Sequence, residues 1–157
     1  MRGFAFVLDH DGQIQQLPVD AFLSTGTARA DAAQFTWLHL DSNDPETLRW
    51  LKAESGLNEV IVAALVATET RPRAEEIGAG ALINLRGLAQ TPITLSDQLA
   101  SIRMWADKGR VVSAFRYPLA ALAQVEDRMR DGWITDPGDL IVGMGMGITP
   151  QLGPEVP

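Results

Sequence analysis

The sequence lacks cysteine altogether and has few histidines. No cysteine occurs among its 157 residues, which excludes a disulfide framework, a thiolate metal site and a cysteine nucleophile. The only histidines are His10 and His39. Because a structural zinc site takes four protein ligands, any such site in this chain would need carboxylates beside its histidines.

Positive charge and long apolar runs are also scarce. Asp and Glu outnumber Lys and Arg by 20 to 13, for a net charge of −7. We therefore expect no nucleic-acid partner, because nucleic acid selects a basic surface. No run approaches the ~18 apolar residues that cross a bilayer, and Asp9 and Asp11 interrupt the apolar N-terminus. We expect neither a membrane span nor a signal peptide within these residues.

Motifs of the common enzyme classes are missing. A Ser-His-Asp arrangement would have to use one of the two histidines, and neither lies near a nucleophile elbow. Gly78, Gly80 and Gly87 do not have the spacing of a phosphate-binding loop. We expect no catalytic residue, no enzyme activity and no required cofactor, and a small hydrolase is the least favoured hypothesis.

Alternating apolar and polar residues, separated by glycine-containing turns, predict a strand-rich chain. The segment Phe35–Leu40 is the clearest strand, with Phe35 and Trp37 on one face and Leu38 and Leu40 on the other. The other predicted strands are Gly3–Leu8, Gln13–Leu17, Arg73–Ile77, Ala81–Leu88, Gln98–Ala106 and Arg110–Arg116, with hairpin turns at Asp11–Gly12, Gly78–Gly80 and Asp107–Gly109.

Prolines and capping residues predict the helices. Ser42 or Asp44 is expected to cap one helix, Asn58 the next, and Asp136 or Asp139 the last. The predicted helical segments are Pro18–Leu23, Pro45 to about Glu54, Glu59 to the charged corner before Pro72, Pro118–Asp131 and a final run over Leu140–Ile148.

Two of these segments have a defined apolar face. In the segment after Asn58, helical spacing brings together Val60, Ile61, Ala64, Leu65 and Ala67. In Pro118–Asp131 the apolar face consists of Leu119, Leu122, Val125 and Met129. Together the segments predict one α/β domain over residues 1–157, with a mixed, mostly antiparallel sheet of six or seven strands packed against helices.

The corner between helix and strand around Pro72 is dense in charge. It holds Glu69, Arg71, Arg73, Glu75 and Glu76. Pro72 stops the helix and favours extended geometry at the residue before it. From charge alone, we expect this corner to be a solvated turn with local ion pairs.

Five sequence segments, taken in their order along the chain, carry a family resemblance. They are F-T-W-L-H-L-D at Phe35–Asp41, E-T-R-P-R at Glu69–Arg73, L-I-N-L-R-G at Leu82–Gly87, S-I-R-M-W at Ser101–Trp105, and R-V-V-S-A-F-R at Arg110–Arg116. Over Gly3–Ile141 the chain resembles the cytoplasmic domain of the CorA superfamily of divalent-cation transporters, in its ZntB-like zinc transporter branch.

The resemblance implies a fold, a location and an assembly. The fold would be an α/β/α sandwich on the cytoplasmic side of the bacterial inner membrane. Five copies would form a homopentameric funnel, or regulatory domain, beneath a pore that carries zinc, magnesium or cobalt. The domain would couple cytosolic ions to transport and catalyse no reaction.

The resemblance is incomplete at the C-terminal end. A stalk helix, two membrane helices and a Gly-x-Asn signature would be expected to follow, and contact with the membrane would be made only through them. Either this is an excised cytoplasmic domain, with its last ~10 residues starting a truncated helical region, or it is a stand-alone soluble ligand-binding domain of the same fold. The prolines after Ile148 favour excision.

Metal-ligand candidates are few. The cluster Asp9, His10 and Asp11 is a candidate weak surface site for zinc or another divalent cation, and the alternative is a solvated turn. His39, inside a hydrophobic strand, is expected to be a partly buried, hydrogen-bonded structural residue rather than a ligand. We expect the isolated chain to bind zinc weakly and to be monomeric or weakly self-associating, because its own interfaces would be small.

Arginine rather than lysine supplies most of the positive charge, which favours planar, partly buried ion pairs. Strand alternation predicts that Arg86, Arg103 and Arg116 share one face near the Arg71/Arg73 corner. One interpretation is internal pairing with the corner carboxylates, Glu69 among them. The other is an anion site, or a charged wall facing the central funnel of an oligomer.

Overall fold

Alternating apolar positions fold into seven strands, with helices between and after them. The computed structural model describes residues 1–25, 33–68, 73–93 and 98–152. Its strands are β1 (Gly3–Asp9), β2 (Ile14–Pro18), β3 (Ala33–Asp41), β4 (Arg73–Ile77), β5 (Gly80–Leu88), β6 (Leu99–Asp107) and β7 (Arg110–Phe115). The helices are α1 (Val19–Ser24), α3 (Pro45–Ala53), α4 (Glu59–Val66), α5 (Leu122–Arg130) and α6 (Pro137–Leu152).

The strands form one mixed sheet with the order β2-β1-β3-β7-β6-β5-β4. Every neighbouring pair is antiparallel except β3 and β7, which run parallel at its centre. Two hairpin turns depend on glycine at positive φ, +59° at Gly78 and +71° at Gly109, a conformation that costs glycine little. The predicted mixed, mostly antiparallel sheet is confirmed.

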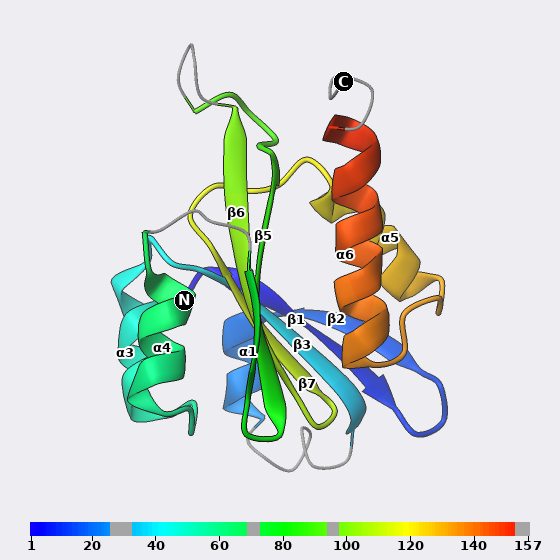
Figure 1. Cartoon of the computed structure of the whole chain (residues 1–157). Helices are drawn as coiled ribbons and strands as arrows, with labels where there is room; N and C mark the ends of the chain where they lie inside the picture. The colour runs from blue at the N-terminus through cyan, green and yellow to red at the C-terminus, as the bar shows by residue number, and fades with distance from the viewer. Residues whose placement is uncertain (26–32, 69–72, 94–97, 153–157) are drawn as a thin grey trace.

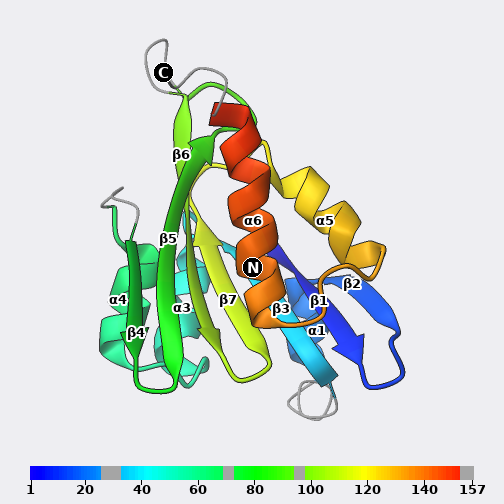
Figure 2. The same cartoon turned by 45° about the vertical axis from the view of Figure 1, so that its right-hand side comes forward.

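Helices cover both faces of the sheet (Figure 1). On one face α1, α3 and α4 pack against apolar residues that include Leu38, Leu40 and Trp105. On the other face α5 and α6 pack against residues that include Trp37, Ile102 and Met104. Figure 2 shows α6 running along β5. Alternate residues of β3 therefore lie in the two cores on opposite faces of the sheet. The predicted α/β/α sandwich is confirmed.

The starts of α3, α4 and α6 have side-chain caps at residues that the sequence predicted. Asp44 accepts a hydrogen bond from Glu46 N at 3.0 Å, and Asn58 accepts one from Ile61 N at 3.0 Å. Asp136 accepts from Asp139 N at 2.7 Å. Each cap satisfies a backbone donor that the first helical turn leaves without a partner.

One helix starts later than predicted. The segment expected to be helical from Pro118 becomes α5 only at Leu122. Before that the chain pairs with the end of β5: Ala120 N donates to Leu88 O at 2.9 Å, and Gln90 N donates to Pro118 O at 2.8 Å. Leu119 forms an isolated antiparallel bridge with Ala89, and Ala120 begins a turn, so these contacts replace the first helical turn. Leu119, Val125 and Met129 are buried as predicted, whereas Leu122 is only partly buried.

A second difference concerns α4. The predicted apolar face included Val60 and Ala67, but Val60 is 67% exposed and the helix ends at Val66. Ile61, Val62 and Leu65 are the buried residues instead. The segment E-V-I-V-A-A-L-V is apolar nearly all round, so its spacing alone did not fix which valine faces the sheet.

Candidate functional site

The strand register brings two of the predicted arginines to the same face of the sheet. Asn84 of β5 lies opposite Arg103 of β6, and Arg103 lies opposite Ala114 of β7. Arg86 lies opposite Ser101, two residues further along the same face. This is the face that α1, α3 and α4 cover, because Trp105 and Ala114 belong to the core beneath those helices.

The arginines differ in burial. Arg103 is 7% exposed and lies among buried polar neighbours, Asn84 and Ser101. Arg86 is half-buried and Arg116 is exposed, just beyond the end of β7. Arg103 lies in the interior, so the burial of these three side chains does not favour a single charged wall that faces solvent.

The rest of the charged corner is only partly described. Glu69 and Arg71 lie outside the described residues. The backbone of Arg73 begins β4, opposite Asn84, and nothing is described of its side chain. Whether the corner pairs internally with these arginines or forms an anion site stays a prediction.

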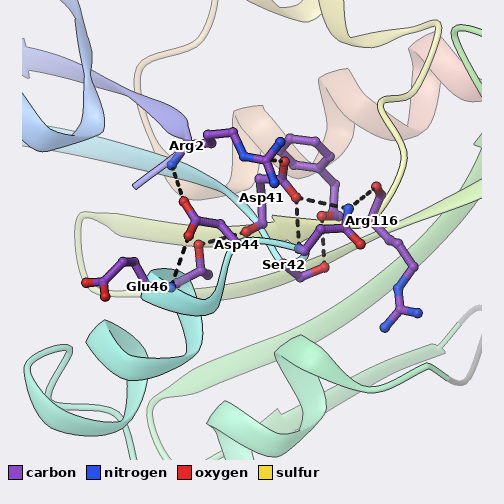
Figure 3. Close-up of polar contacts among 9 residues, drawn as sticks. Arg2, Asp41, Ser42, Asp44, Glu46 and Arg116 are labelled. Carbon is purple, nitrogen blue, oxygen red and sulfur yellow. Dashed lines mark hydrogen bonds and ion pairs between the residues drawn. The ribbon is translucent and has the colours of Figure 1, made fainter.

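A second polar cluster lies where the parallel strands β3 and β7 end (Figure 3). Carboxyl ends of neighbouring parallel strands are a common place for ligands in α/β sheets. Here Asp41 Oδ1 accepts hydrogen bonds from Asn43 N at 2.8 Å and Asn43 Nδ2 at 3.0 Å. Asn43 Nδ2 also donates to the carbonyl oxygen of Arg116 at 2.6 Å. The guanidinium of Arg116 points away from this cluster.

The carboxylates of this cluster hold the N-terminus against α3. Asp44 Oδ2 accepts from Arg2 N at 2.8 Å, and Arg2 Nε lies 3.4 Å from Asp41 Oδ2. The hydrogen bonds from the backbone N–H groups of Arg2 and Glu46 lower the pKa of Asp44. These carboxylate oxygens already accept hydrogen bonds or form an ion pair within the chain. The cluster therefore joins the N-terminal segment to the start of α3. Sequence reasoning found Asp44 as a cap but missed its bond to Arg2, because no local pattern reports a contact 42 residues away.

The predicted metal candidates lie at the turn between β1 and β2. Asp9 Oδ1 accepts hydrogen bonds from Asp11 N and Gln13 N, both at 2.9 Å, so this oxygen shapes the turn. His10 and Asp11 are exposed. Among the described residues, no three His, Asp or Glu side chains are arranged to hold a metal ion. Weak metal binding at this turn stays a prediction.

His39 lies in the interior, in a small polar network. It is 2% exposed, its Nδ1 lies 2.6 Å from Ser113 Oγ, and Trp37 Nε1 donates to the same hydroxyl at 2.9 Å. Its ring stacks on Phe115 with centroids 4.5 Å apart. Burial lowers the pKa of His39 to about 3, so the ring is neutral at physiological pH. The structure agrees with a structural histidine.

A hollow of about 540 Å³ lies between α1, α3 and the sheet, over apolar residues that include Phe22, Leu38 and Trp50. Its charged rim is neutralised within the chain. The N-terminal ammonium lies 2.8 Å from Asp20, and Arg49 lies 2.8 Å from Glu46 and 3.3 Å from Glu54. With its charges already paired, this hollow has no evident preference for an ion.

Comparison with known proteins gives the family. Residues 32–149 match the family described as CorA-like Mg²⁺ transporter protein. The zinc transport protein ZntB of Yersinia pseudotuberculosis is 31% identical over 147 residues, which is 93% of this chain and 43% of that protein. The divalent cation transporter CmaX of Pseudomonas aeruginosa is 36% identical over 97 residues, 61% of this chain and 29% of that protein.

Solved structures show the same fold. The match to the full-length CmaX structure covers 98% of this chain and 47% of the CmaX chain, with a TM-score of 0.81 at 26% identity. The match to the ZntB cytoplasmic domain from Vibrio parahaemolyticus covers 99% of this chain and 61% of that domain's chain, with a TM-score of 0.76 at 16% identity.

The match is nearly complete for this chain but partial for its relatives. The chain spans less than half the length of the curated transporters it matches. Within the part of the chain that the structure describes, no helix is both long enough and apolar enough to cross a membrane. The chain belongs to the CorA-like family, as a ZntB-like N-terminal domain of that family.

Proposed function

We propose that this chain is the cytoplasmic funnel, or regulatory, domain of a ZntB-like divalent metal-ion transporter in the bacterial inner membrane. The observation that carries the proposal is the match to ZntB in sequence over nearly the whole chain, together with the match in fold to a ZntB cytoplasmic domain. The domain itself catalyses no reaction.

Zinc is the first metal to test, because the relatives that match most of this chain are named for zinc transport. Magnesium and cobalt are the alternatives. No three ligands converge within the described residues, so we place metal selection in the membrane part of the transporter rather than in this domain. Cytosolic ions would act on transport through this domain's charge and assembly.

The acidic composition gives the domain an electrostatic role. Each chain carries a net charge of −7, so five chains of a homopentamer would carry −35 in this layer. A field of that sign raises the local concentration of divalent cations near the pore. The effect should weaken at high salt, because the Debye length falls to about 3 Å at 1 M ionic strength.

A chimera tests the proposal. This chain would replace the matching segment of ZntB from Yersinia pseudotuberculosis, in cells that lack their own zinc transporters of this type. The rate of radioactive zinc uptake should remain within about tenfold of that of the parent ZntB. A tenfold ratio corresponds to about 1.4 kcal/mol. A chimera that reaches the membrane at the normal level but carries no zinc would contradict the proposal. A stop codon in its first membrane helix is the matched negative control.

A further inference from the structure

Exposed apolar side chains gather at one corner of the domain. Among the described residues, five large hydrophobic side chains are exposed, and three of them line one hollow: Trp133 in the loop between α5 and α6, and Val142 and Met146 on α6. Trp133 is 77% exposed, Val142 59% and Met146 55%. They border a hollow of about 460 Å³ that Ile134 and Gly143 also line. We define these five residues as the α5–α6 patch. Tryptophan and methionine are enriched in protein interfaces, which makes this patch a candidate contact surface.

A recessed apolar groove lies on the other side of the sheet. It runs between α3 and α4, has a volume of about 600 Å³, and is lined by Leu48, Leu57, Val62, Ala63 and Val66. We define these five residues as the α3–α4 groove. Figure 1 shows that α3 and α4 lie on the face of the sheet opposite to α5 and α6. One surface therefore projects apolar side chains, and the opposite surface offers a hollow.

Charges of both signs flank both surfaces. Lys52 and Glu59 line the α3–α4 groove, and Arg128 and Asp131 line the hollow of the α5–α6 patch. Within the described ranges, none of these four side chains forms an ion pair. Contact between the two surfaces could therefore match Lys52 with Asp131 and Glu59 with Arg128.

We propose that the α5–α6 patch of one copy of this chain packs into the α3–α4 groove of a second copy. The contact rests on the proposed function only in that the transporter is a homo-oligomer. Because the two surfaces lie on opposite faces of one sandwich, the contact is heterologous, and repeating it produces a ring if the rotation closes. A patch centred on one tryptophan gives a small interface, so the contact is weak in the isolated domain and depends on other parts of the assembly.

The absence of native cysteine allows a direct test by disulfide cross-linking. Ala63→Cys places one thiol in the groove, and Met146→Cys places one on the patch; both side chains are exposed. The two variants of the 157-residue chain are mixed at about 1 mM, where a contact with a Kd near 1 mM is populated, and oxidised mildly. Mixed dimers should exceed those of a Lys108→Cys and Met146→Cys mixture by about tenfold, since Lys108 lies in an exposed turn and lines neither surface.

Charge reversal sharpens the test. Lys52→Glu in the Ala63→Cys chain should reduce the mixed dimer, and Asp131→Lys in the Met146→Cys chain should restore it. Cross-linking no greater than the Lys108→Cys control would overturn the proposal. So would equal cross-linking of Met146→Cys with itself, since that would indicate a patch-to-patch contact. Zinc uptake by the chimera is measured separately, so failure here with intact uptake overturns this contact and leaves the proposed function standing.

Discussion

Acidification from pH 7.5 to pH 5 should cost this chain about 2 kcal/mol of unfolding free energy through His39 alone. The pKa of His39 is lowered from 6.5 to about 3, because the ring is buried in the folded chain. In the described structure its neighbours are the rings of Phe4, Trp37 and Phe115 and the hydroxyl of Ser113. A protonated imidazole has no counter-charge among these groups.

The direction of this pH dependence follows from proton binding by the folded and unfolded chains. Below pH 6.5 the unfolded chain protonates His39, whereas the folded chain does so only near pH 3. The stability from the neutral ring is therefore complete above the unfolded pKa and falls by about 1.4 kcal/mol per pH unit below it. The chosen window lies above the range in which most carboxylates titrate.

Urea denaturation at pH 7.5 and pH 5 measures this loss. His39→Gln removes the titrating ring and should cancel about 2 kcal/mol of the pH dependence, whatever its effect on stability at pH 7.5. His10→Gln is the matched control, because His10 is the other histidine and is exposed. If His39→Gln kept the full pH dependence, the buried neutral ring would not be its source.

Replacing Arg103 by alanine should lower the unfolding free energy by about 2–4 kcal/mol, whereas Arg116→Ala should change it by less than about 0.5 kcal/mol. Arg103 is 7% exposed in the middle of β6, and its removal leaves a hollow beside Asn84 and Ser101, which are themselves buried and polar. Arg116 is exposed beyond the end of β7.

Denaturation midpoints of the two variants distinguish a structural arginine from a functional one. A stable Arg103→Ala chain would indicate that this side chain is held in the interior for a purpose other than folding, such as binding an anion. A large loss for Arg116→Ala would contradict the exposure of that side chain.

Most elements of the fold followed from local chemistry. The strand alternation at β3, the glycine turns at Gly78 and Gly109 and the cap at Asn58 each depend on neighbours within a few residues. These local preferences predict the final structure because the tertiary contacts favour the same conformations. The family resemblance, carried by the charged corner and by segments on β3, β5, β6 and β7, supplied the sandwich arrangement that propensity alone did not give.

The remaining features depend on contacts between distant residues. The parallel pairing of β3 with β7 joins residues about 75 positions apart, and no local pattern reports it. The late start of α5 was missed because the hydrogen bonds of Pro118 and Ala120 go to the distant residues Gln90 and Leu88. The burial of Arg103 was missed because alternation gives the face of a strand and not the depth of a side chain beneath a helix.

The most direct test of the transporter assignment is the size and location of the natural protein that contains this chain. Since 147 matched residues make up 43% of the ZntB relative, a protein of that length has about 340 residues and a mass of roughly 35–40 kDa. If the proposed function holds, antibodies raised against the 17.0 kDa chain should detect such a protein in the inner-membrane fraction of the cells that make it. A 17 kDa protein found only in the fraction free of membranes would contradict the account and favour a stand-alone ligand-binding domain of the same fold.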